Sequence, residues 1–227
     1  MARTVNSEAR AVRQEAFVDA GQRLIQAKGY EQMSIQDVLD ELDASRGAFY
    51  HYFDSKVALL EVVVERMVDA ATAALGPVVA DPSLPALAKL DRLFSGIAGW
   101  KAERKNLVLA VMRVWLSDDN TIVREKFRQR LVVTLGPLLA QIIRQGKDEG
   151  VFSVTSPDDA ARVLVSLSQG ANQVATELFV AHQANAIPFE VVESTVAAYR
   201  EAYERILGVP AGSLTIGDSE TLRFWFT

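Results

Sequence analysis

Apolar residues recur every three to four positions along most of the chain, which is the spacing of one face of an α-helix. In residues 7–28, Val12, Ala16 and Ala20 follow one another at four-residue steps and share a face, and Gly29 suits a left-handed cap just beyond. Runs of alternating apolar and polar residues, which indicate strands, are few. The pattern therefore predicts an all-α protein.

Two shorter helices are expected next. Ser34 suits the position before a helix, because its side chain can accept a hydrogen bond from a free amide, and Asp37 three residues later makes a variant of the capping box. A turn at residues 43–44 separates this helix from a third one over residues 45–52. A long fourth helix is expected from about residue 55 to residue 75.

The segment GPVVADPSLP, which follows residue 75, interrupts the pattern with three prolines and a glycine, so we expect a loop or a domain connection there. Further helical stretches lie near 84–100, 104–117, 119–149, 157–182 and 189–207. Gly136 and Pro137 are expected to kink or split the helix over 119–149. The last residues, TLRFWFT, are strongly apolar; they either dock on an apolar groove of their own chain or a partner, or form a disordered extension.

Composition narrows the class of protein. The chain has 227 residues, 49% of them hydrophobic, and no apolar run approaches the roughly 18 residues that span a bilayer, so we expect a cytoplasmic protein without a membrane partner. It has no cysteine and only two histidines, His51 and His182, which leaves little for a metal site or a catalytic triad. Phosphate-binding and dinucleotide-binding motifs are also missing from the sequence. We therefore expect neither an enzyme nor a cofactor.

The segment SRGAFYHYF, residues 45–53, concentrates polar and aromatic side chains at the third expected helix. Arg46 and Tyr50 are four residues apart and share a face, while Phe49 belongs to the opposite, inward face. Arg46 can donate two hydrogen bonds to a guanine, and Tyr50 and Tyr52 can reach phosphate oxygens. Preceded by two other short helices, the segment is typical of the second member of a helix-turn-helix, which enters the major groove of DNA.

Other residues around this segment complete the expected DNA-binding surface. Ser34 can contact the DNA backbone, and Gln36, one turn along, can reach a base edge. Lys56 lies at the start of the fourth helix, where its charge and the helix amides both favour a phosphate. Gly47 would allow the backbone to approach DNA closely, and His51 lies beside it on the same short helix. Ser45 caps that helix.

Charge places a condition on this interpretation. The chain has a formal net charge of −5, and residues 1–56 contain seven Lys or Arg against nine Asp or Glu. Such a protein would not coat nucleic acid nonspecifically, because that binding depends on many basic residues. The positive residues must therefore be sorted to one face.

The sequence GYEQMSIQDVLDELDASRGAFYHYFDSKVALL, residues 29–60, resembles the DNA-binding domain of TetR-family transcriptional regulators. Three features carry the resemblance: Ser34 at the start of a helix, Ser45-Arg46-Gly47 at the entry to the next, and Tyr50-x-x-Phe53-x-x-Lys56 at its end. Asp43 stands where the family usually has a glycine, and Leu39 where it has a small alanine. The resemblance implies phosphate contacts by Ser34, Tyr50, Tyr52 and Lys56, and base contacts by Gln36, Ser45 and Arg46.

The resemblance also implies an organisation of the whole chain. Residues 1–56 would be the helix-turn-helix domain that binds a double-stranded DNA operator, and residues 57–207 a helical bundle that forms a homodimer and binds a small-molecule effector. Residues 208–227 would be a tail. We expect a repressor that binds a palindromic operator as a dimer and is released by a small apolar or amphipathic effector. The alternative is an adaptor of the same fold that recruits a protein partner and has no effector.

Two surfaces are expected in the C-terminal region. A dimer face is expected from the apolar stripe of the 157–182 helix and the next helix, which consists of Val163, Leu164, Leu167, Ala171, Val174, Leu178, Val191, Val192, Val196 and Tyr199. A mostly apolar effector pocket with a few polar anchors is expected from Phe94, Trp100, Met112, Trp115, Phe127, Asn172, Gln173 and Thr176.

Overall fold

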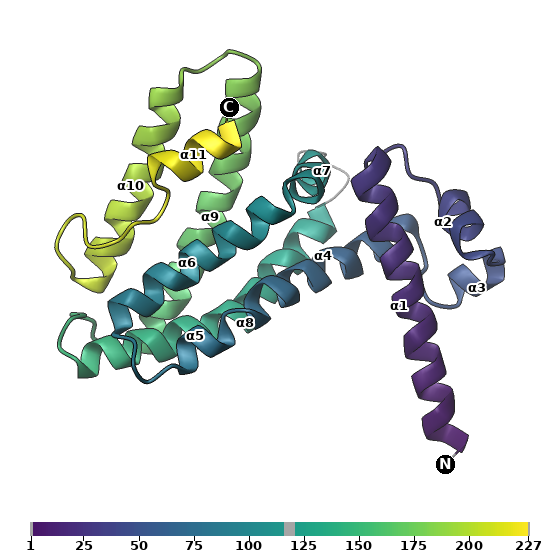
Figure 1. Cartoon of the computed structure of the whole chain (residues 1–227), viewed down its shortest axis with the longest axis horizontal. Helices are drawn as coiled ribbons and strands as arrows, with labels where there is room; N and C mark the ends of the chain where they lie inside the picture. Colours follow the sequence, from purple (N-terminus) through teal and green to yellow (C-terminus); the bar gives the residue numbers. More distant parts are fainter. Residues whose placement is uncertain (1, 116–120, 227) are drawn as a thin grey trace. The chain divides into compact units, whose positions relative to one another are not determined.

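The computed structural model describes residues 2–115 and 121–226, and all regular secondary structure in these ranges is helical (Figure 1), which confirms the all-α prediction. The helices are α1 (Ala2–Lys28), α2 (Ile35–Leu42), α3 (Arg46–Tyr50), α4 (Lys56–Ala73), α5 (Gly76–Ala80), α6 (Ala86–Glu103), α7 (Lys105–Trp115), α8 (Thr121–Asp148), α9 (Pro157–Gln183), α10 (Phe189–Leu207) and α11 (Ser219–Phe226). None of the helices in these ranges has the length and apolar character that crossing a membrane requires.

The chain forms two compact units. Unit 1 comprises Met1–Asp69 with Glu103–Arg130, and unit 2 comprises Ala70–Ala102 with Leu131–Thr227. Packing therefore joins most of α4, all of α7 and the first residues of α8 to the N-terminal helices. The functional division into 1–56, 57–207 and 208–227 stays a prediction, because compactness alone does not show which residues bind DNA or an effector.

Unit 1 is held together by an apolar core built mainly from α1 and α4, to which α2 and α3 add Val38, Leu39 and Phe49. Phe17 of α1 is fully buried and meets Phe49 of α3 edge to face, with ring centroids 5.7 Å apart. Phe53 follows one turn after Phe49 and is buried beside both rings. Leu59 and Val63 of α4 complete the same cluster. The core thus fixes the short α3 against two much longer helices.

Local backbone geometry follows the predicted caps. Gly29 ends α1 with a φ of 83°, a left-handed conformation in which glycine carries no side-chain penalty. Ser34 and Asp37 form both halves of the capping box at the start of α2. Asp43 ends α2 in the left-handed region, with φ 46° and ψ 50°. An aspartate is among the few non-glycine residues that adopt this conformation readily, so the turn keeps its shape without the glycine usual in the resembled family.

Two proline-containing segments differ in part from what was expected. The segment after Leu75 is not a loop throughout, because α5 occupies Gly76–Ala80 with Pro77 in its first turn, where a missing amide costs nothing, and with Val79 buried. Of the two alternatives for Gly136 and Pro137, a kink or a split, the split is wrong, because α8 is one helix through Pro137. Its apolar face, which includes the buried Leu139 and Ile142, continues on both sides of the proline, and this burial offsets one lost hydrogen bond.

In unit 2 the C-terminal residues form α11, which packs against α9 and α10. Leu222 and Phe226 are buried there together with Val192. The ring of Phe226 makes edge contacts with Phe179 of α9 and Phe189 of α10, at centroid distances of 5.9 and 6.4 Å. Of the two alternatives for TLRFWFT, docking on the chain's own surface is therefore confirmed for the residues up to 226.

Substitution Phe226→Ala is expected to lower the free energy of unfolding by about 3 kcal/mol, because it removes a buried ring and leaves a cavity between three helices. The matched control is Phe224→Ala on the same helix, where the ring is 46% exposed and the loss should stay within about 0.5 kcal/mol. Urea unfolding of both variants measures the difference. Equal losses at the two positions would contradict the docking of α11.

Candidate functional site

The side chains of α3 divide between the core and the surface. Ser45 caps the helix by accepting a hydrogen bond from the backbone N–H of Ala48, at 3.2 Å. Phe49 points into the core, whereas Arg46 and Tyr50 are exposed, with half of the Tyr50 surface in contact with solvent. The helix has only five residues, so one turn carries both functions: anchoring through Phe49 and display through Arg46 and Tyr50.

Neither Arg46 nor Gly47 is needed to hold the fold of the described residues together. The Arg46 guanidinium has no hydrogen-bond or ion-pair partner among residues 2–115 and 121–226. A Cβ atom placed on Gly47 would meet only the Ser45 hydroxyl, at 3.9 Å, so nothing in the fold demands a glycine there. Both residues are thus available to something outside the chain. Direct recognition of a base uses an arginine guanidinium that has no other partner and a backbone that can approach the DNA closely.

The residues at the start of α2 are exposed but already engaged in local hydrogen bonds. The Ser34 hydroxyl accepts from the Asp37 amide at 3.1 Å and lies 2.7 Å from the Asp37 carboxylate, to which it donates. Gln36 donates from its side-chain nitrogen to Asp40 at 2.7 Å. A contact of Ser34 or Gln36 with DNA would therefore share or exchange these bonds.

Asp37 is the electrostatic centre of the turn between α1 and α2. Its carboxylate lies 2.6 Å from the Lys28 ammonium and accepts from the Ser34 backbone amide at 2.7 Å. The hydrogen bond from Lys28 and the two bonds from Ser34 hold the pKa of Asp37 well below its ordinary range. The turn is thus fixed by a carboxylate that stays ionised under all ordinary conditions.

Lys56 has a structural role that sequence reasoning missed. Its ammonium donates to the backbone carbonyls of Tyr30 and Met33, at 3.0 and 3.1 Å, and lies 4.1 Å from the centre of the Tyr30 ring. Burial, with the nearby Glu31 carboxylate, raises the pKa of Tyr30 to about 12, so that ring stays a neutral phenol beside the cation. Lys56 therefore ties the start of α4 to the turn that precedes α2.

The remaining aromatic residues of the segment have different environments. Tyr52 is half-buried, and its ring lies 5.7 Å from that of Phe17, so part of it belongs to the core. His51 is exposed at the end of α3, with its ring edge against Tyr52 at 4.9 Å. Tyr52 can therefore present only part of its side chain, whereas His51, like Tyr50, is exposed.

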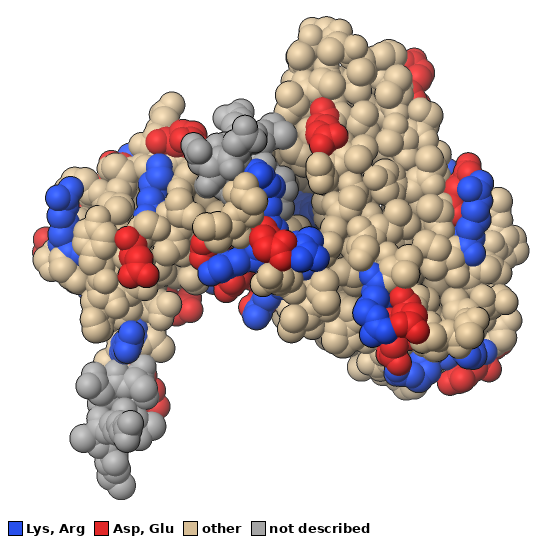
Figure 2. All heavy atoms as spheres, turned by 180° about the vertical axis from the view of Figure 1, so that it is seen from behind, with Lys and Arg blue, Asp and Glu red and all other residues tan. Residues whose placement is uncertain are grey.

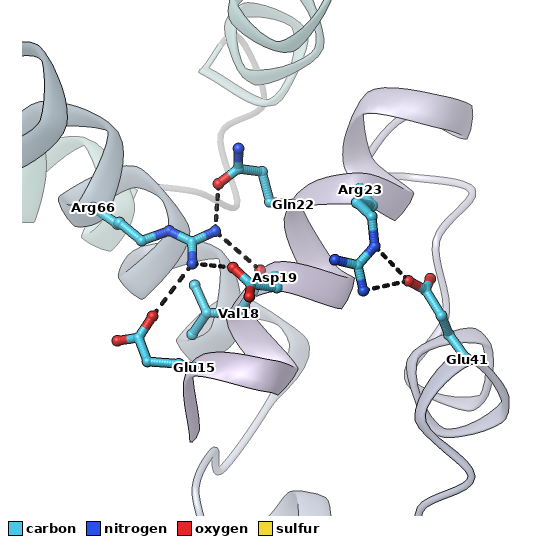
Figure 3. Close-up of polar contacts among 7 residues, drawn as sticks. All are labelled: Glu15, Val18, Asp19, Gln22, Arg23, Glu41 and Arg66. Atoms are coloured by element: carbon cyan, nitrogen blue, oxygen red, sulfur yellow. Dashed lines mark hydrogen bonds and ion pairs between the residues drawn. The ribbon is translucent and has the colours of Figure 1, made fainter. Parts of the chain in front are cut away.

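Ion pairs mask much of the acidic charge of unit 1. Arg23 of α1 binds Glu41 of α2 at 2.7 Å, and Arg66 of α4 binds Asp19 and Glu15 of α1 at 2.5 and 3.3 Å (Figure 3). On the face of the molecule seen in Figure 2, Lys and Arg lie beside Asp and Glu and do not form one large basic patch. The sorting of positive residues to one face, which the charge count requires, is therefore not seen on this face, and each ion pair also uses a cation. Arg46 is an exposed cation outside these pairs.

Comparison with known proteins agrees with this arrangement. Residues 17–63, from the middle of α1 into α4, match the family described as bacterial regulatory proteins, tetR family. Residues 17–63 therefore belong to the tetR family of bacterial regulatory proteins. The transcriptional repressor DhaR of Mycobacterium sp. (strain GP1) is 23% identical over 163 residues, which are 72% of this chain and 82% of that protein.

Solved structures share the fold of the chain over most of its length. A TetR transcription regulator from Haloarcula marismortui ATCC 43049 is 22% identical and has a TM-score of 0.61, covering 87% of this chain and 97% of that one. The complex of RolR with resorcinol is 18% identical with a TM-score of 0.57, covering 96% of this chain and 95% of that one. At these identities the likeness concerns the fold alone.

The predicted effector residues fall in both units of the chain. Met112 of α7 and Phe127 of α8 belong to unit 1, where Phe127 packs on the core around Phe17. Trp115 ends α7, but its side chain lies outside the described residues. Phe94, Trp100, Asn172, Gln173 and Thr176 belong to unit 2.

Within unit 2 the structure separates these residues further. Gln173 is exposed and donates to Glu177 at 3.1 Å, so it lies on the outer surface of α9. Asn172 and the buried Thr176 lie together, since the Thr176 hydroxyl donates to the Asn172 carbonyl at 2.9 Å. The Asn172 side chain accepts from Lys101 of α6, also at 2.9 Å. Lys101 was not predicted, although a lysine on the face of α6 that carries apolar residues was a visible signal.

Substitution Asp37→Asn is expected to lower stability at pH 7, because it removes the partner of Lys28 and weakens the cap on α2. Since the pKa of Asp37 is lower in the folded than in the unfolded chain, its contribution is complete above the ordinary carboxyl pKa of 3.8 and is lost as pH falls through the folded value. The difference from the wild type should therefore shrink in acid.

Urea unfolding at pH 7 and at about pH 3 measures this difference. Asp40→Asn, on the same helix, is the matched control, because Asp40 accepts only from Gln36 among the described side chains and should matter little. A deficit of the Asp37 variant that does not change with pH would show that the charge of Asp37 is unimportant.

Proposed function

We propose that this regulator binds a double-stranded DNA operator by inserting α3 into the major groove. The observation that carries this proposal is the exposed guanidinium of Arg46, which has no partner among the described residues, one turn before the exposed Tyr50 on a helix that is anchored by the buried Phe49. A helix anchored by one face and open on the other can enter the groove without disturbing the core. Arg46 would donate to O6 and N7 of a guanine.

The other residues take roles around this contact. Gln36 and Ser45 would approach base edges, and Ser34, Tyr50 and Tyr52 would bind phosphates. Lys56 has committed two of its three N–H groups to backbone carbonyls, so the third, with the free amides at the start of α4, would face a phosphate. Gly47 would let the backbone approach the DNA, with His51 alongside.

A homodimer on a roughly palindromic operator would place two copies of α3 about 34–36 Å apart, in successive major grooves. Part of the predicted dimer stripe is used inside the chain, because Leu164 and Val192 are fully buried. Leu178 and Val196 also pack on the cluster around Phe226. The proposed face therefore narrows to what stays accessible on α9 and α10: Val163, Leu167, Ala171, Val174, Val191 and Tyr199.

Repression relieved by a small effector is the proposed output. DhaR, which is similar over 72% of this chain, is named a repressor, and RolR, which has the same fold, was solved with resorcinol bound. An effector that prefers the conformation with wrongly spaced recognition helices must lower DNA affinity, because coupling between two binding sites is reciprocal. Helix α4 connects the parts of the chain that would carry these two binding sites, since its first residues belong to unit 1 and its last, Ala70–Ala73, to unit 2.

The DNA contact is tested by selecting bound fragments from a random DNA pool and then measuring affinity for the selected site. Arg46→Ala should weaken binding about 10- to 100-fold and abolish the preference for guanine at one position of each half-site. Tyr50→Phe should weaken binding to all sequences alike, because it removes a phosphate contact. Arg23→Ala, which removes an arginine paired with Glu41, is the control. Unchanged sequence preference in Arg46→Ala would refute the proposed role of α3.

The dimer face is tested by sedimentation or light scattering at micromolar protein. Val163→Asp should raise the dissociation constant of the dimer at least about tenfold, because an unpaired carboxylate would be buried between subunits. Val133→Asp on α8 is the control, since Val133 is 66% exposed and lies outside the proposed face. A wild-type protein that is monomeric under these conditions would reject the dimer.

A further inference from the structure

Lys101 is unusually placed for a lysine. It lies seven residues after Phe94 on α6, so both share the face of the helix that continues from the buried Leu90. Phe94 packs edge to face on Tyr203 of α10, at 5.2 Å, which shows that this face is turned toward α9 and α10. The Lys101 ammonium reaches Asn172 of α9 from the same face. A cation thus follows two turns of apolar and aromatic packing inside unit 2.

The charge of Lys101 has no counter-charge. Within residues 2–115 and 121–226, no carboxylate lies at ion-pair distance from its ammonium, and its one hydrogen bond goes to the neutral Asn172 side chain, at 2.9 Å. Burial lowers the pKa of Lys101, and no neighbouring charge contributes to that shift. Lys101 is half-buried, and a partly desolvated ammonium with a single neutral acceptor is costly for the fold. If Lys101 served only stability, an apolar residue at its position would cost the fold no stability.

Some hydrogen-bond donors around the ammonium have no acceptor within the described residues. An ammonium can only donate, so the Asn172 atom that faces it is the oxygen, and the Asn172 amide nitrogen has no partner among the described residues. No buried side-chain polar atom of those residues lacks a partner, so this nitrogen retains access to solvent. The nearby hydroxyls are occupied: Thr176 donates to the Asn172 carbonyl, and Ser168 bonds with Tyr203. What is missing from the site is an acceptor.

We propose that the effector is a small organic anion whose carboxylate or phenolate oxygen binds between the Lys101 ammonium and the Asn172 side-chain amide. The anion supplies both the counter-charge and the acceptor that the chain does not. This inference rests on the proposed function, because it names the chemistry of the proposed effector. It adds Lys101 as the residue that selects the effector. The half-buried ring of Phe94, on the same face of α6, suits an apolar body attached to the charged group.

The first test separates a binding lysine from a structural one by urea unfolding without ligand. Lys101→Met should leave the unfolding midpoint unchanged or raise it, because the substitution removes a desolvated charge and keeps the apolar stem. Lys147→Met is the matched control for net charge, since Lys147 is exposed and donates to the Thr155 carbonyl. A clear loss of stability confined to Lys101→Met would overturn the proposal by showing that the ammonium holds the fold together.

The second test measures binding of benzoate, phenolate-forming 4-nitrophenol and hexanoate by calorimetry, with benzamide and hexanamide as uncharged counterparts. At least one anion should bind, and about 10- to 100-fold more tightly than its amide or, for 4-nitrophenol, than the same compound below its pKa. That preference should disappear in Lys101→Met and weaken in Asn172→Leu, but persist in Lys147→Met. Equal binding of anions and amides, anion binding retained by Lys101→Met, or no binding of any anion at millimolar concentration would overturn the proposal.

Operator release distinguishes this inference from the proposed function. Release of DNA by benzamide as readily as by benzoate would support the proposed effector response and refute the anionic anchor. Tight, Lys101-dependent binding of an anion without any change in DNA affinity would support the anchor and refute the effector response.

Discussion

The burial of Phe49 against Phe17 is the contact on which the functional surface depends. Helix α3 has five residues, far fewer than the roughly 12–15 at which an isolated helix becomes even marginally stable in water. It exists because Phe49, which is fully buried, fixes it to α1 and because Ser45 caps its start. Arg46 and Tyr50 owe their positions to this one aromatic contact. A small apolar core thus determines the geometry of a polar surface.

The features that the sequence predicted well are those encoded within one or two helical turns. The inward positions of Phe49 and Phe53, the cap at Ser34 and the left-handed turn at Asp43 each depend on residues at most four positions apart. Periodicity likewise located the long helices to within a few residues in the described ranges. The helix-turn-helix could be recognised because its anchoring and exposed residues alternate on a single short segment.

What could not be predicted depends on partners distant in the sequence. Lys56 looked like a phosphate ligand because nothing in its own segment shows that two carbonyls, 26 and 23 residues earlier, accept from it. The pairing of Lys101 with Asn172 spans 71 residues, and the expected pocket lining could not reveal that Gln173 faces outward while its neighbour Asn172 faces inward. Only the packing of the helices decides which of several polar residues on α9 meets α6.

Arg66 has a consequence for how the N-terminal helices can move. Its guanidinium donates to Glu15, to Asp19, to the Val18 carbonyl and to Gln22, acceptors spread over two turns of α1 (Figure 3). One turn of a helix rises about 5.4 Å, so sliding α1 past α4 by a single turn would take the outer acceptors beyond reach. A lysine, with a point charge in place of a planar fork, could not hold the same set. Arg66 therefore fixes the register of α1 on α4 and opposes the sliding of one helix along the other.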